Sequence, residues 1–410
     1  MKLLLKELKK LFNLRLSIIL AVFTALYFCL ILSASFLYLG TGQNDYFLSL
    51  HKELLSEFGG ELSLDEWDAF LAKREEIAAE FADKLAEADS EILNKYDIKS
   101  YEDYLREQDR VFSKLFSKNE DDVELEREMN RVTHQNESTY MLLFRLQLMD
   151  HRYIWKKEKY HSILSSESEF EAAVEAGPGH FAYLNEAVLA REKELATRGR
   201  VSLIPDSLID LPEHDFGHLL ALAAIICFIL VLPRPINERL RSMRPIQLVT
   251  KTGRGIFAVQ ARACVLFGIA VGVFLSLSYC ILLCVQGLFI YFPLDINGVH
   301  WHTFWMDMSY GCYLLIHAGV LTFFAICCSL AAYFIGRLAR SYIAGIGLAL
   351  PVAAALVYGF SKLTVNLLSA YTITSLSDSL TQYGGMLAIF AAIALAVLIM
   401  LKRDKVRDIL

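Results

Sequence analysis

A basic stretch between two long apolar segments constrains this chain more than any other feature. Residues 234–262 contain seven arginines and lysines against one acid, Glu238. Lysine and arginine beside a membrane span resist translocation, so a short basic loop marks the cytoplasmic side. The sequence therefore predicts that 234–262 is a cytoplasmic loop, and the rest of the topology is counted from it.

Six apolar segments have the length of about twenty residues that is needed to cross a bilayer. They cover roughly 16–39, 216–233, 263–292, 311–335, 341–361 and 384–401. Basic residues follow the last segment and occupy the turn at 336–341, whereas the loops at 293–310 and 362–383 contain few. Six crossings that start inside also end inside, so we expect a multi-pass membrane protein with both termini in the cytoplasm.

The segment 41–215 differs from the rest of the chain in charge. It holds 21 Lys and Arg against 39 Asp and Glu, a net charge of −18, whereas the remaining residues carry a net charge of +12. We expect an acidic domain outside the cell, inserted between the first and second spans. All eight cysteines fall in apolar segments, so the insert has no disulfides, which fits a bacterial surface better than a secreted module.

Apolar residues of the insert recur with helical spacing. They repeat every three, four or seven residues from Trp67 to Tyr96, and Ser63 with Glu66 forms a capping box before them. Further helices are predicted at 101–116, at 123–164 with its most apolar part at 140–149, and at about 181–197. With about 175 residues, the insert is large enough to form its own core.

The first fourteen residues place leucines on one helical face and lysines largely on the other. This pattern is typical of a helix that lies along the inner leaflet. The apolar run after it is too long for a signal peptide, so we expect a retained span. The expected organisation is an interfacial helix at 1–14, a span at 15–40, the insert at 41–215, five spans within 216–401, and a cytoplasmic tail at 402–410.

The basic loop resembles the first cytoplasmic loop of ABC-2 type transporter permeases, especially those of Gram-positive bacteria. There a glutamate precedes a small residue and methionine, a leucine-rich turn, a Ser/Thr-Lys-x-Gly-Arg run and a basic residue that opens the next span. The matching residues here are Glu238, Ser242-Met243, Leu248, Thr250-Lys251-Thr252-Gly253-Arg254 and Arg262. Ser242 and Arg262 depart from the family, which usually has glycine and lysine there. The helix at 1–14 also fits, because the family has an elbow helix before its first span.

The resemblance implies an all-α fold, with a six-helix transmembrane domain of ABC-2 exporter type and a helical extracellular domain between spans 1 and 2. It also implies that the loop docks a short helix into a separate ATPase. Glu238 and Arg241 would contact the ATPase, and Gly253 would permit a tight turn. The full set of expected coupling residues is Glu238, Arg241, Met243, Thr250, Lys251, Gly253 and Arg254. On charge alone, these basic residues could instead set topology and bind anionic lipid headgroups.

The chain shows no motif for catalysis of its own. Gly253-Arg254-Gly255 lacks the spacing and the terminal Lys-Ser/Thr of a P-loop, and no hydrolase arrangement is present. We therefore expect no enzyme activity and no cofactor here, with ATP bound by a partner subunit. Within the spans between 216 and 401 there is no Asp, Glu, Lys or Arg, which argues against an ion-coupled transporter.

Two histidine features are weaker candidates. His300 and His302, with Asp295 and Asp307 nearby, could form a metal site, but an aromatic interfacial loop of this kind more often anchors a span boundary. His317 lies within a span, where we expect a packed, hydrogen-bonded imidazole rather than a proton relay.

These observations predict the permease subunit of an ABC transporter in a bacterial cell membrane. It would pair with an ATPase, with a second permease copy or paralogue and with membrane lipids, but not with nucleic acid, and it would export peptides, antimicrobial compounds or lipid-like molecules. An alternative is an ATP-driven sensor or mechanotransmitter that passes motion to its extracellular domain without moving cargo. A third hypothesis is a surface scaffold with no ATPase.

Overall fold

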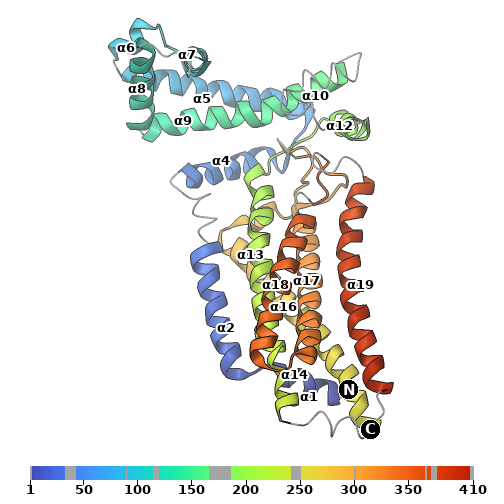
Figure 1. Ribbon diagram of the computed structural model, residues 1–410. Helices are drawn as coiled ribbons and strands as arrows, with labels where there is room; N and C mark the ends of the chain where they lie inside the picture. The colour runs from blue at the N-terminus through green and yellow to red at the C-terminus, as the bar shows by residue number, and fades with distance from the viewer. Residues whose placement is uncertain are drawn as a thin grey trace. The chain divides into compact units, whose positions relative to one another are not determined.

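The computed structural model describes residues 2–32, 43–88, 90–113, 120–135, 137–165, 186–241, 251–299, 302–364, 367–370 and 376–406. The chain divides into two compact units. The membrane unit comprises Met1–Leu39, Asp206–Ile296 and Phe304–Leu410, and the insert unit comprises Gly40–Pro205 and Asn297–Thr303. Both units are built mainly of helices, which confirms the all-α fold class (Figure 1).

The membrane unit contains the long apolar helices. Its elements are α1 (Lys2–Leu11), α2 (Leu14–Tyr27), η1 (Phe28–Leu32), α13 (Asp206–Val231), α14 (Pro233–Leu240), α16 (Lys251–Val285), η4 (Leu288–Tyr291), α17 (Tyr310–Leu338), α18 (Tyr342–Thr364) and α19 (Leu376–Val406). Among the described residues, six helices are long and apolar enough to cross a membrane, and each overlaps one predicted span. The prediction of a multi-pass membrane protein is confirmed.

Helices α13, α16 and α17 form the centre of the membrane unit (Figure 1). The apolar window of α13 is 67% buried and that of α17 is 56% buried, against 17% for α2 and for α19. The outer helices thus leave apolar side chains exposed, as expected for helices that face hydrocarbon.

Helix α13 begins earlier than predicted. Residues 206–215, which we assigned to the insert, are its first ten residues. We interpreted Pro212 as a turn residue, but the structure places it inside the helix. A helical proline leaves the carbonyl four residues before it without its usual partner. Here the Tyr310 hydroxyl donates to that Leu208 carbonyl at 2.9 Å, so the helix continues through the proline.

The insert unit is a separate helical body with one small sheet. Its helices are α4 (Gln43–Phe58), η2 (Leu64–Glu66), α5 (Trp67–Glu87), α6 (Glu91–Lys95), α7 (Tyr101–Ser113), α8 (Glu120–Gln135), α9 (Glu137–Leu148), η3 (Met149–Ile154), α10 (Trp155–Ser165) and α12 (Glu186–Arg198). Strands β1 (Glu61–Leu62) and β2 (Val201–Ser202) pair antiparallel. The predicted helices at 67–96 and 123–164 are each divided, into α5 and α6 and into α8 and the run from α9 to α10.

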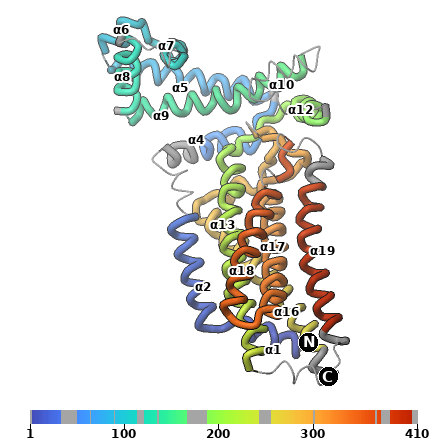
Figure 2. Tube along the Cα trace, viewed as in Figure 1, coloured from blue at the N-terminus to red at the C-terminus, as the bar shows by residue number. Residues whose placement is uncertain are grey.

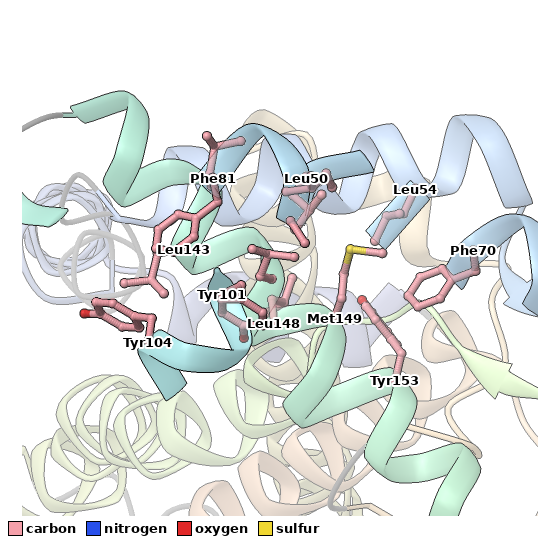
Figure 3. Close-up of a cluster of buried hydrophobic side chains, with 14 of the residues drawn as sticks. Leu50, Leu54, Phe70, Phe81, Tyr101, Tyr104, Leu143, Leu148, Met149 and Tyr153 are labelled. Carbon is pink, nitrogen blue, oxygen red and sulfur yellow. The ribbon is translucent and has the colours of Figure 1, made fainter. Parts of the chain in front are cut away.

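The core of the insert unit lies where α5 packs against α9 (Figure 2). The predicted stripe on α5 is buried, and the apolar stretch at 140–149 supplies Leu143, Leu148 and Met149 to the same cluster (Figure 3). Phe81 meets Tyr101 and Tyr104 edge-on, with ring centroids 5.9 and 5.6 Å apart. At the start of the stripe, the Glu66 carboxylate accepts a hydrogen bond from the Ser63 N–H at 2.8 Å, as the predicted capping box requires, and a further one from the Ser63 hydroxyl at 2.7 Å.

We expect Phe81→Ala to lower the free energy of unfolding of the insert unit by about 3–5 kcal/mol, because it opens a cavity among buried rings. Urea midpoints for proteolysis of the insert in the full chain would measure the change. Phe112→Ala is the matched control, since Phe112 is 71% exposed. Equal losses in the two variants would mean that Phe81 is not a core residue.

A buried histidine predicts that the insert loses stability in acid. His51 is fully buried, and its Nδ1 lies 2.7 Å from the Tyr153 hydroxyl. Burial, aided by the nearby charge of Arg152, lowers the pKa of His51 to about 3. The unfolded chain therefore binds a proton below pH about 6.5 that the folded chain does not take up until about pH 3. The stability that neutral His51 provides is full above pH 6.5 and declines as the pH falls toward 3.

We expect the unfolding free energy of the insert to fall by about 1.4 kcal/mol more per pH unit in the wild type than in His51→Phe between pH 6 and 4. Urea midpoints across this pH range would give the two slopes. The slope is compared rather than the stability at one pH, because the substitution also removes the partner of Tyr153. Parallel slopes would show that His51 does not titrate as proposed.

A buried polar junction as the candidate functional site

The predicted coupling loop begins with the short helix α14, which follows α13 after one turn residue. Pro233 and Pro235 occupy its first turn, where a missing N–H costs no helical hydrogen bond. Helix α14 packs against α17 and α18. At Gly336 a side chain would come within 2.7 Å of the Leu232 carbonyl oxygen, so the close approach of α17 to the start of α14 needs glycine.

Buried polar side chains of α1, α14 and α16 meet in one cluster. Glu238 of α14 and Glu7 of α1 are 8% and 2% exposed. The Gln260 amide of α16 lies between them, and its Nε2 donates to both Glu238 oxygens at 3.0 Å and to Glu7 Oε2 at 3.3 Å. We call Glu7, Arg234, Glu238 and Gln260 the polar junction.

Two cations balance the two carboxylates of the junction. Arg234 Nη2 lies 3.1 Å from Glu238 Oε1 and 3.5 Å from Glu7 Oε2. Lys10 forms an ion pair with Glu7 from the more exposed side of α1. Removing a carboxylate from water is unfavourable unless it gains an opposite charge and hydrogen bonds. The junction supplies both, so it fixes α1, α14 and α16 to one another.

A second set of contacts fixes the far half of α14. The Arg239 guanidinium donates to three backbone carbonyls at the end of α17, those of Arg337 at 2.6 Å, Leu338 at 3.1 Å and Ala339 at 2.5 Å. The last carbonyls of a helix have no partner within it, and a cation also suits the negative end of the helix dipole. Arg239 therefore ties α14 to α17 while α14 itself ends at Leu240.

The structure changes the roles expected of several loop residues. Glu238 is buried and hydrogen-bonded to Gln260 within the chain, and its expected contact with a partner stays a prediction. Arg241, at the end of α14, is exposed. Gly253 lies inside α16 rather than at a tight turn, because that helix already begins at Lys251; Arg254 is helical too. Met243 and Thr250 lie outside the described residues.

Sequence reasoning missed Glu7 and Gln260. Each had a local signal: Glu7 shares a helical face with Leu4 and Leu11, and Gln260 shares one with Phe257 and Cys264. A polar residue at an otherwise apolar position on a helix points to a buried partner. The signal does not show which partner, since Glu7 and Gln260 are 253 positions apart.

Carboxylates also occur at the start of α13, just before residue 216, where we expected the span to begin. Asp215 is fully buried and accepts a hydrogen bond from the Tyr279 hydroxyl at 3.0 Å, and Glu213 accepts one from Tyr313 at 3.1 Å. The span helix that includes residue 216 thus contains acids, and the exclusion of ion-coupled transport does not stand as we stated it.

The remaining candidates form no cluster that the structure describes. His300 and Trp301 lie outside the described residues. Within the residues that the structure describes, no group of three or more metal-ligating side chains occurs. The Nδ1 of His317 lies 3.0 Å from the Tyr313 carbonyl oxygen, in the packed and hydrogen-bonded setting that we expected.

Comparisons with protein-family models, with curated proteins and with solved structures found no match for this chain. The functional interpretation therefore rests on the chain's own residues and on the loop resemblance.

We expect Gln260→Leu to destabilise the membrane unit by about 3 kcal/mol, because it removes hydrogen bonds to two buried carboxylates. The variant should melt at a lower temperature in mild detergent, and the amides of α1 should exchange hydrogen faster. Gln286→Leu is the matched control, since Gln286 is exposed just beyond the other end of α16. Unchanged melting and exchange in Gln260→Leu would show that the junction does not hold α1.

Proposed function

We propose that this chain is the permease subunit of an ABC-2 type transporter in a bacterial plasma membrane, driven by ATP that a separate subunit binds and hydrolyses. The attachment of α14 is the observation that carries the proposal. This short helix between two spans is held by the polar junction and by Arg239, while Leu240 and Arg241 at its tip are exposed. A partner that pushed on the tip would move α1, α16 and α17 together.

The other parts of the proposal follow from charge and exposure. The basic residues of 234–262 and after the last span support a cytoplasmic position for α14 and both termini, with the acidic insert outside. Apolar side chains exposed on α2, α18 and α19 offer surface to lipid and to a second permease. The transporter exports peptides, antimicrobial compounds or lipid-like molecules, and ATP is bound only by the partner subunit.

The second candidate is an ATP-driven mechanotransmitter. It is favoured by the insert unit, which has its own core and forms a compact body that could receive motion. Assays in vesicles that contain the complex distinguish transport from mechanotransmission. ATP-dependent movement of a cargo across the membrane supports transport, whereas an ATP-dependent change in the insert without cargo movement supports transmission.

Affinity purification from native membranes in mild detergent tests the partnership. We expect the wild type to retain an ATPase with a P-loop, and Leu240→Asp with Arg241→Glu to lose it, because the exposed tip then presents negative charge to the partner. Lys402→Glu with Arg403→Glu is the matched control, since these exposed cations lie at the end of α19.

Two results would contradict the proposal at different points. If no ATPase co-purifies with the wild type, the transporter assignment fails. If the tip variant keeps the ATPase while the tail variant loses it, the docking site is on the tail and not on α14.

A further inference from the structure

A large pocket in the membrane unit is lined by residues of α13, α16 and α17. Its volume is about 790 Å³, within the range of about 300–1,000 Å³ that is typical of small-molecule sites. Phe216 and Leu219 of α13, Leu277 and Leu283 of α16, and Leu315 and Leu321 of α17 are among its lining residues. Nearly all of its wall is apolar.

The pocket lies next to a close crossing of α16 and α17. At Gly272 of α16 a side chain would lie 2.4 Å from the Thr322 Cα of α17, so the two backbones are in direct contact there. The pocket begins at this crossing: its lining on α16 starts at Val273, and its lining on α17 ends at Thr322. Glycine at the crossing thus allows the two helices to touch, and the pocket lies on one side of that contact.

Most polar groups on the wall already have partners in their own chain. The Tyr279 hydroxyl donates to Asp215, the Thr322 hydroxyl donates to the Ala318 carbonyl at 2.8 Å, and the Ser309 hydroxyl accepts from the Cys312 N–H at 3.3 Å. Among the buried side-chain nitrogen and oxygen atoms of the wall, Ser276 Oγ and His317 Nε2 have no hydrogen-bond partner in the part of the chain that the structure describes. A polar or charged ligand would therefore be desolvated with few compensating bonds.

The rim of the pocket is continuous with surface that faces hydrocarbon. Val273, Leu277 and Leu315 are 44%, 58% and 70% exposed, and all three lie within membrane-spanning helices. A hydrocarbon chain can reach the pocket from the bilayer without crossing water. A second copy could cover the pocket only with a surface shaped to this concave site, because tight interfaces need complementary shapes.

We propose that this pocket binds the long hydrocarbon chain of a membrane amphiphile. The site is separate from the polar junction, and the inference does not require an ATPase partner. The chain comes either from a two-chain bilayer lipid or from a single-chain amphiphile, and both present the same chemistry to the wall.

Gly319 allows the pocket to be filled without disturbing its wall. It lines the pocket, and a side chain built there meets no atom within 4 Å. Gly319→Phe therefore places a ring in the pocket, and a helical glycine is replaced by a better helix former. Gly347→Phe is the matched control, because Gly347 is an exposed glycine of α18 with the same open surroundings.

The test is photolabelling of the full chain in phosphatidylcholine nanodiscs, with adducts mapped by mass spectrometry. One arm uses phosphatidylcholine with a diazirine in its acyl chain, and the other adds a diazirine-bearing long-chain fatty alcohol to unlabelled nanodiscs. We expect adducts on 273–283 and 311–322 that excess unlabelled alcohol suppresses in the second arm. Gly319→Phe should reduce them about ten-fold, because it excludes about two methylenes of the chain, whereas Gly347→Phe should not.

Each outcome supports or overturns the proposal. Labelling in the first arm alone identifies a bilayer lipid, and labelling in the second arm alone identifies a single-chain amphiphile. Labelling no denser than at the exposed Leu348 and Leu350 of α18, or equal labelling in the two glycine variants, overturns the proposal. Cross-links between two chains at the pocket, without lipid adducts, would show that a second copy covers it.

His317→Phe is a further check on the chemistry of the wall. It keeps an aromatic ring against Phe216 and removes the unpartnered Nε2. Labelling should persist, because burial of the hydrocarbon carries the binding. Loss of labelling in a variant that melts like the wild type would mean that the ligand is recognised through a polar group, and the proposal would be wrong.

Discussion

Two carboxylates buried behind α14 are the constraint on which the loop end of the membrane unit depends. Glu7 and Glu238 can be shielded from water only because the Gln260 amide donates to both and Arg234 lies beside both. A buried charge that loses its partner is strongly destabilising, by about 3–5 kcal/mol. The three helices that supply these groups therefore cannot shift independently at little cost, which makes the junction suitable for passing a load from α14 to α1 and α16.

The same rule explains how the membrane unit tolerates its irregular backbone. Pro212 leaves the Leu208 carbonyl of α13 without its helical partner, and the Tyr310 hydroxyl donates a hydrogen bond to that carbonyl. The end of α17 leaves carbonyls without helical partners, and Arg239 donates to three of them. A backbone carbonyl that is shielded from water needs another donor, and a side chain supplies one at each of these irregularities. One of those donors, Arg239, also positions the helix proposed to dock the ATPase.

Features that depend on hydrophobicity and spacing within a short stretch of sequence were predicted correctly. The six apolar segments, the stripe on α5 and the capping box at Ser63 follow from hydrophobicity and spacing, and the structure contains them. Pro212 was misinterpreted because its compensation comes from Tyr310, far along the chain. The resemblance to permease loops implied that Glu238 contacts a partner, and it gave no sign that this carboxylate is buried. Its burial depends on Gln260 and Glu7, and no sequence spacing indicates that pairing. The predicted transport partners, the cargo and the orientation remain proposals.

The most direct test is whether the junction moves as one body. The eight free cysteines of the chain complicate thiol labels, so spin labels would be introduced as non-natural residues at Lys9 of α1 and Arg262 of α16, which are both exposed. Electron–electron distance measurements would be made on the complex purified from native membranes, with and without ATP. We predict one narrow distance distribution that ATP does not change, and a broad distribution in Gln260→Leu. A wild-type distance that is broad, or that shifts when ATP binds, would show that α1 and α16 move separately and that the junction does not couple them.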